Sequence, residues 1–362
     1  MKYMSETSEL ERLISIRIVQ EDAETIFSLL SSERDSIFAM EIIPYYALFV
    51  QSCQEYIGEN LLSEDIALNI RDIRNHIKSY AESFGKSKRK VASIDQEQDM
   101  SFKSQLKFDF LKSWDIHLNL GTYWTEDNNI IGNTQQLAAF IDTKDLSDPK
   151  VGKKLYDLGY QIGSFVSSVR GGLSESLGQP MIARTTTAIT IKNYYDINTN
   201  RHNIFFVDNA SKELNLFYLH LLCNMNFVKY VLNPLFPDGN KWAFRVEYIV
   251  TYYTFRALLR LKNYCENNDD VSVDINGIKE LETDKGYMFQ TKFRNCMMHY
   301  GLGNQNVLSL EYIERPFFGI IENCFDGMDY QTYLGRLHFF SDRVIGFLEK
   351  HFNCDAVKLK QL

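Results

Sequence analysis

The stretch that decides how this chain folds is Lys292-Phe293-Arg294-Asn295-Cys296-Met297-Met298-His299-Tyr300-Gly301. Its apolar residues continue a helical spacing that begins earlier in the sequence, so we predict one helix over residues 284–300. The core-facing stripe of this helix comprises Phe289, Phe293, Cys296 and Met297. Gly301 follows, and glycine is the usual residue just past the end of a helix. The stretch therefore predicts a helix with one buried face and several polar side chains beside it.

Three further helices are predicted around this one. They lie near residues 211–232, 241–265 and 329–352, where apolar residues again recur at helical spacing. Four helices of this length can enclose the core of an antiparallel bundle. We therefore interpret residues 205–355 as a C-terminal helical domain.

The N-terminal part of the chain, residues 1–180, has the pattern of a second helical region. Helices are predicted from Glu6, from about Ser36 to Ile57, from 62 to 84, from 102 to 118 and from 151 to 169. The basic and polar run 85–99 is predicted to be a loop, and Gly171-Gly172 to end the last helix. Between the two regions, β-branched and aromatic residues at 188–194 and 203–207 flank Asn198-Thr199-Asn200 and predict a small β-hairpin. The expected fold class is mainly α.

Composition limits the possible functions. The chain has 362 residues, of which 45% are apolar and 24% charged, and a net charge of −8. This acidic balance argues against broad, non-specific binding to nucleic acid, although it allows a local cationic site. Six scattered cysteines show no zinc-site spacing, and no glycine-rich phosphate loop is present, so we expect no metal and no cofactor. The N-terminus lacks a signal peptide and no apolar run is long enough for a membrane span, which predicts a cytoplasmic protein without membrane contact.

The polar residues of the quoted stretch carry the chemistry. Asn295 and His299 are four residues apart, which places them on one face of the predicted helix, and Arg294 flanks the same groove. The guanidinium of arginine matches phosphate oxygens, and histidine exchanges protons near neutral pH. Together these residue types indicate chemistry on a phosphodiester.

An Arg, a polar residue, three further residues and then His, late in an all-helical bundle, resembles the signature of HEPN domains. The resemblance covers about residues 205–355, and only the motif is specific. It implies a metal-independent endoribonuclease that works as a homodimer on RNA, in a phage-defence or toxin-type system and under a regulatory protein partner. By this resemblance Arg294 and His299 are the catalytic pair, and Asn295 orients them. We further expect Lys292 and Tyr300 to contact the substrate.

Other interpretations of the motif remain open. In a structural alternative, Arg294 pairs with Glu247 or Asp284, and His299 caps the helix end. The domain would then be a non-catalytic scaffold. In a third interpretation it is a nucleotide sensor, which uses Arg294 in the same groove to bind phosphate without cleavage. Arg74-Asn75, followed by Tyr80, matches the quoted stretch at three positions and suggests either a degenerate second copy or a coincidence.

Overall fold

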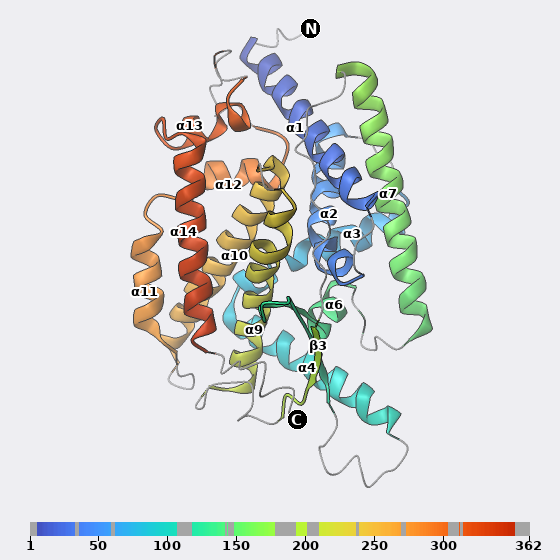
Figure 1. Ribbon diagram of the computed structural model, residues 1–362, viewed down its shortest axis with the longest axis vertical. Helices are drawn as coiled ribbons and strands as arrows, with labels where there is room; N and C mark the ends of the chain where they lie inside the picture. Colours follow the sequence, from blue (N-terminus) through green and yellow to red (C-terminus); the bar gives the residue numbers. More distant parts are fainter. Residues whose placement is uncertain are drawn as a thin grey trace.

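The computed structural model describes residues 6–32, 36–58, 62–106, 118–141, 143, 148–177, 193–200, 210–236, 239–268, 273–302, 311 and 314–351. It is mainly α-helical, as the sequence predicted, and carries one small antiparallel sheet (Figure 1). No helix among these residues combines the length and the apolar character needed to cross a membrane.

The N-terminal half consists of helices that pack around α2. Their bounds are α1 Glu6–Leu30, α2 Ser36–Ile57, α3 Glu64–His76, α4 Phe84–Gln105, α6 Thr134–Phe140 and α7 Pro149–Leu177, with a short 3₁₀ turn η1 at Ser79–Ala81. The long helix α7 lies along α1 at one side of the molecule (Figure 1). Helix α3 packs on α2, which brings its last turn toward the C-terminal half.

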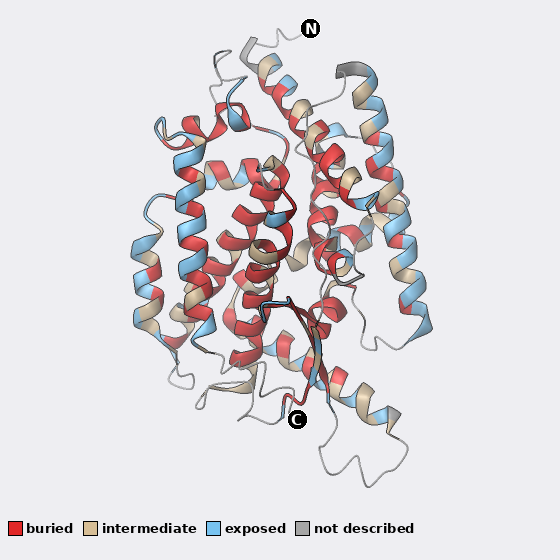
Figure 2. Cartoon of the chain, viewed as in Figure 1, coloured by how far each residue is buried: buried red, intermediate tan, exposed pale blue. Residues whose placement is uncertain are grey.

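The C-terminal half is built on two helices that are buried along most of their length, α9 Lys212–Phe227 and α10 Lys241–Cys265. Figure 2 shows α9 almost entirely and α10 mostly in the buried colour, whereas α7 and α14 expose one face. The remaining elements surround them: η2 Val228–Leu232, η3 Asn233–Leu235, α11 Ile275–Asp284, α12 Thr291–Met298, η5 Pro316–Gly319, α13 Ile320–Cys324 and α14 Tyr330–Glu349.

One continuous hydrophobic core joins the two halves. It runs from residues of α1 and α2, such as Ile26 and Phe49, to residues of α10 and α14, such as Tyr248 and Leu348. Aromatic rings fill much of it, because each buried ring removes a large apolar area from water. The boundary predicted between residues 180 and 205 falls mostly outside the described residues.

The small sheet has the strand order β2-β1-β3, with β1 at Leu120–Trp124, β2 at Ile130–Asn133 and β3 at Asn193–Ile197. Its hairpin is formed by β1 and β2, outside the segment in which the sequence predicted one. The predicted partner strand at 203–207 lies outside the described residues. The described strand at 193–197 instead pairs with β1, about seventy residues earlier in the chain, which local sequence patterns do not reveal.

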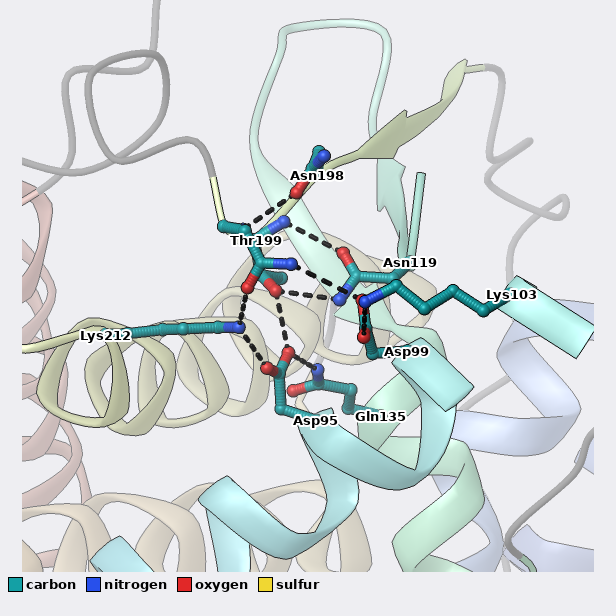
Figure 3. A network of polar contacts seen from close by, with 9 residues as sticks. Asp95, Asp99, Lys103, Asn119, Gln135, Asn198, Thr199 and Lys212 are labelled. Atoms are coloured by element: carbon teal, nitrogen blue, oxygen red, sulfur yellow. Dashed lines mark hydrogen bonds and ion pairs between the residues drawn. The ribbon is translucent and has the colours of Figure 1, made fainter. Parts of the chain in front are cut away.

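A buried polar network around Asp95 fixes this sheet to the helices (Figure 3). Asp95 Oδ1 accepts hydrogen bonds from Gln135 Nε2 at 2.7 Å and from Thr199 Oγ1 at 2.9 Å, and Oδ2 pairs with Lys212. Asn119 Oδ1 accepts from the backbone N–H of Thr199 at 2.8 Å. The network thus connects α4, α6, the end of β3 and the start of α9, and both oxygens of Asp95 are engaged by the protein itself.

Three helix boundaries differ from the predictions. Residues 85–99 are not a loop but part of α4, whose buried face includes Ser87, Asp95 and Gln98, so that apolar periodicity alone could not reveal it. Helix α7 continues through Gly171-Gly172. A Cβ atom added at either glycine would meet no atom from the rest of the protein within 4 Å, so neither position requires a break in the helix. The predicted helix 284–300 is divided at Gly286, where a positive φ of 48° ends α11.

Candidate active site

The predicted motif lies at the end of α12, which is only eight residues long. Phe293, Cys296, Met297 and Met298 point into the core, so Arg294 and Asn295 are left on the outer side of the helix. Ser52 Oγ of α2 donates a hydrogen bond to the carbonyl oxygen of Met298 at 2.7 Å. This bond fixes the end of α12 against α2, so the next residue is held beside α2.

His299 is that residue, and it has left the helix. Its backbone is extended, with φ −138° and ψ 154°, and its N–H donates to the carbonyl oxygen of Asn295 at 2.9 Å. The side chain is 43% exposed, and Nδ1 lies 3.5 Å from Oε2 of Glu55 on α2. Glu55 Oε1 in turn accepts a hydrogen bond from Gln51 at 2.7 Å. A carboxylate behind the imidazole therefore orients the ring, while solvent can still reach it.

Tyr300 anchors the segment that follows. Its ring is 2% exposed, and its hydroxyl donates to Oδ2 of Asp22 on α1 at 2.7 Å. Arg245 of α10 also pairs with Oδ2 of Asp22 at 3.1 Å and lies over the Tyr300 ring. The structure thus gives Tyr300 an internal partner and no surface for a ligand, unlike the substrate contact expected from the sequence.

Arg294 is half-buried and has no carboxylate partner among the described residues. Its Nε is buried and makes no hydrogen bond. The two partners of the structural alternative are engaged elsewhere, since Glu247 binds Asn233 and His338, and Asp284 binds Arg343. The guanidinium of Arg294 is therefore available to an anion.

A second arginine reaches the same place from α3. Arg74 is half-buried, its Nε is buried without a hydrogen bond, and no carboxylate of the described residues pairs with it. Its positive charge lowers the pKa of both His299 and Tyr253. Arg256 of α10 also acts on Tyr253, although burial still raises the pKa of that phenol. The charges of Arg74, Arg256 and Arg294 thus all act on Tyr253, and those of Arg74 and Arg294 also act on His299. Of these arginines, only Arg294 was predicted as a site residue.

The protonation state of His299 follows from its surroundings. Partial burial lowers its pKa most, and the nearby charges of Arg74 and Arg294 lower it further. Glu55 acts in the opposite direction and does not outweigh them. The pKa of His299 therefore lies below its usual value, so at neutral pH the imidazole is uncharged and can accept a proton.

The remaining predicted residues lie around this centre without joining it. Asn295 is exposed, and its side chain makes no hydrogen bond with the described residues. The charge of Lys292 acts on Glu11 and Cys324, toward α1 and α13 rather than toward His299. His76, the last residue of α3 and not a predicted site residue, packs beside Phe140 and is bound to Lys90, and burial lowers its pKa to about 3.

Sequence reasoning missed Glu55 and underrated Arg74. The only signal for Arg74 was the short match between Arg74-Asn75 and Arg294-Asn295, and none existed for Glu55. Within the described part of the chain, no group of three or more His, Cys, Asp or Glu side chains is arranged to hold a metal ion. The arrangement offers two guanidinium groups without carboxylate partners among the described residues and one proton acceptor.

Comparison of the chain with protein-family models, with curated proteins and with solved structures finds no match.

Proposed function

We propose that the chain is a metal-independent endoribonuclease of the HEPN type, with its active site at Arg74, Arg294 and His299. The observation that carries the proposal is the meeting of two arginines without carboxylate partners and one uncharged histidine at the surface of α12, α3 and α2. The buried, unpaired Nε atoms of Arg74 and Arg294 favour an anionic partner, because a buried donor without a hydrogen bond costs free energy. In RNA, each phosphodiester anion lies beside a ribose 2′-hydroxyl, which can give its proton to a neighbouring base.

In the proposed reaction, the ribose 2′-hydroxyl attacks the adjacent phosphorus. His299 accepts the proton of that hydroxyl, and Arg74 and Arg294 neutralise the charge that develops on the phosphoryl oxygens. Glu55 is a positioning residue, because it holds Nδ1 of His299 and leaves Nε2 for the substrate. The 5′-oxygen leaves and takes up a proton, which gives a 2′,3′-cyclic phosphate and a 5′-hydroxyl end.

The arrangement also bears on assembly. The resemblance implies a homodimer in which two motifs face each other, whereas here Arg74 brings a second arginine to His299 within one chain. We propose that Arg74 takes the place of the second motif's arginine for binding the phosphate. The resemblance to HEPN domains supplies three further parts of the proposal. These are a dimer, a regulatory partner and a role in phage defence or as a toxin.

The experiment that tests the activity uses labelled RNA and excess EDTA. The chain is expected to cleave single-stranded RNA and to leave 2′,3′-cyclic phosphate ends, while DNA of the same sequence stays intact because it lacks the nucleophile. RNA that remains uncut, or cleavage that EDTA abolishes, would contradict the proposal and favour a scaffold or a nucleotide sensor at this groove.

A further inference from the structure

The outer face of α10 carries tyrosines and arginines together. Most of this helix is buried, whereas Tyr252, Tyr253 and Arg256 are half-buried and Arg260 is exposed. Tyr252, Arg256 and Arg260 are spaced by four residues, and Tyr253 lies three residues before Arg256. The four side chains therefore share one face of the helix, which we call the α10 patch.

The α10 patch is cationic in a chain that is acidic as a whole. The sequence from Tyr248 to Cys265 contains no Asp or Glu, although the net charge of the chain is −8. Arg256 Nη1 donates to the hydroxyl of Tyr252 at 3.4 Å, and neither Arg256 nor Arg260 pairs with a carboxylate in the described part of the chain. Two guanidinium groups without a neutralising partner there favour an anion from outside the chain.

The patch also offers an aromatic side chain to a ligand. The rings of Tyr252 and Tyr253 meet edge to face, with centroids 5.0 Å apart. Tyr248, one turn earlier, is fully buried, whereas Tyr253 is partly open to solvent and its hydroxyl makes no hydrogen bond with the described residues. An aromatic ring beside cationic groups suits a single-stranded nucleic acid, because any unpaired base can stack on the ring while the backbone meets the cations.

The patch is continuous with the candidate active site. Helix α12, which ends beside His299, packs against α10 (Figure 1), and the rings of Phe293 and Tyr248 lie 4.9 Å apart at this contact. The charges of Arg74 and Arg294 both act on Tyr253, which is therefore the part of the patch nearest the site. From there the patch extends along α10 for about two helical turns, to Arg260.

We propose that the α10 patch binds the unpaired strand of RNA on one side of the phosphate that is cleaved. One base stacks on Tyr253, and Arg256 and Arg260 bind phosphates further along the strand. Duplex RNA fits less well, because its bases are stacked on one another and not available to the ring. An acidic polypeptide could pair with the arginines but has no base for Tyr253. The choice of RNA as the occupant rests on the proposed ribonuclease function.

Fluorescence anisotropy of the full chain with a labelled 2′-O-methyl RNA measures binding alone, because the blocked 2′-hydroxyl cannot attack the phosphate. Tyr253→Leu is expected to bind this strand about tenfold more weakly, a typical effect of losing one stacked base. Tyr160→Leu is the matched control, because the Tyr160 ring is 64% exposed and lies on α7. The control is expected to bind like the wild type.

The two arginines are tested by the salt dependence of the same binding. Arg256→Gln and Arg260→Gln are each expected to lower the slope of log affinity against log salt concentration by about 0.7, because each removes one phosphate contact. Arg336→Gln, at an exposed position on α14, is the control and is expected to keep the wild-type slope. Since Arg260 is exposed, this measurement stays decisive even if Tyr253→Leu does not fold.

The possible outcomes separate this inference from the proposed function. Wild-type affinity and slope in folded Arg256→Gln and Arg260→Gln proteins would overturn the inference, even if the chain cleaves RNA. So would displacement of the strand by duplex RNA or polyglutamate as effectively as by the unlabelled strand. Weaker binding in the patch variants, with no cleavage of ordinary RNA by the wild type, would support the patch and refute the ribonuclease proposal alone.

Discussion

Glu55 Oε2 of α2 lies 3.5 Å from Nδ1 of His299, the residue at which the backbone leaves α12. The contact joins positions 244 residues apart in sequence, and it gives the imidazole a fixed orientation. It also raises the pKa of His299, in opposition to burial and to the charges of Arg74 and Arg294. The pKa of His299 is therefore sensitive to Glu55, Arg74 and Arg294 together.

Replacing Arg74 with Gln is expected to raise the pKa of His299, because one of the cations that destabilise the charged imidazole is removed. Since the proposed base acts when it is uncharged, the acid limb of the activity profile moves to higher pH. Glu55→Gln is expected to shift the pKa and the limb in the opposite direction. NMR titration of the imidazole measures both shifts directly, and identical pKa values in the two variants would refute this electrostatic account.

Arg74→Ala is expected to lower RNA cleavage by about 10²–10³-fold, the usual cost of removing one preorganised group that stabilises transition-state charge. Arg71→Ala is the matched control, because Arg71 lies three residues earlier on α3 and is exposed. It is expected to cleave like the wild type in single-turnover assays. Equal losses in the two variants would mean that α3 contributes only general charge.

Tyr300→Phe removes the hydroxyl that donates to the buried carboxylate of Asp22. Because a buried acceptor loses a partner, the free energy of unfolding is expected to fall by about 1–3 kcal/mol. Urea denaturation measures the change, and Tyr287→Phe, at a ring that is 90% exposed, serves as the control. A loss no larger than that of the control would show that Tyr300 does not anchor the segment after His299.

Asp95→Asn breaks the ion pair with Lys212 at the centre of the polar network in Figure 3. The expected cost is about 3 kcal/mol, at the lower end for a buried pair because Lys212 is partly exposed. Asp127→Asn, in the exposed turn between β1 and β2, is the control. Thermal unfolding distinguishes the two, and an Asp95→Asn variant as stable as wild type would contradict the structural role of this network.

Acid is expected to destabilise the protein through its packed histidines. Burial lowers the pKa of His220 and of His76 to about 3, below the usual value of 6.5 for an unfolded chain. Between these values the unfolded state binds more protons, so stability falls as the pH drops from about 6.5 toward 3, by about 1.4 kcal/mol per pH unit for each histidine. His220→Gln is expected to flatten this dependence, and urea denaturation across the pH range checks it.

The sequence predicted those elements whose own residues carry the signal. Helix α10 was predicted with its observed bounds, because its apolar residues recur at helical spacing as far as Cys265. Helix α4 was not predicted, because polar residues such as Asp95 and Gln98 occupy its buried face. The hydrogen-bond partners of Asp95 and Gln98 lie on elements distant in sequence, and a local sequence pattern does not reveal such contacts.

The residues of the candidate site were also predicted only in part. Arg294 and His299 are close in sequence, so their spacing was visible, although the predicted single helix was wrong and His299 lies beyond the end of α12. Glu55 lies beside His299 only because α2 packs against that end, through contacts such as that of Ser52 with Met298, and the charge of Arg74 acts on His299 from α3. The grouping of Glu55 and Arg74 with His299 depends on tertiary packing between segments more than two hundred residues apart. A local sequence pattern therefore cannot predict it.

The most direct test of the central claim is cleavage of one labelled RNA in the presence of EDTA. The assay compares the wild type with Arg294→Ala, His299→Ala and the control Arg343→Ala. Arg343 is a suitable control position because it is exposed and pairs with Asp284. The proposal predicts cleavage by the wild type and the control, and a loss of at least about a hundredfold in the two site variants, with all four proteins folded by circular dichroism. Full cleavage by a folded Arg294→Ala or His299→Ala protein would contradict it.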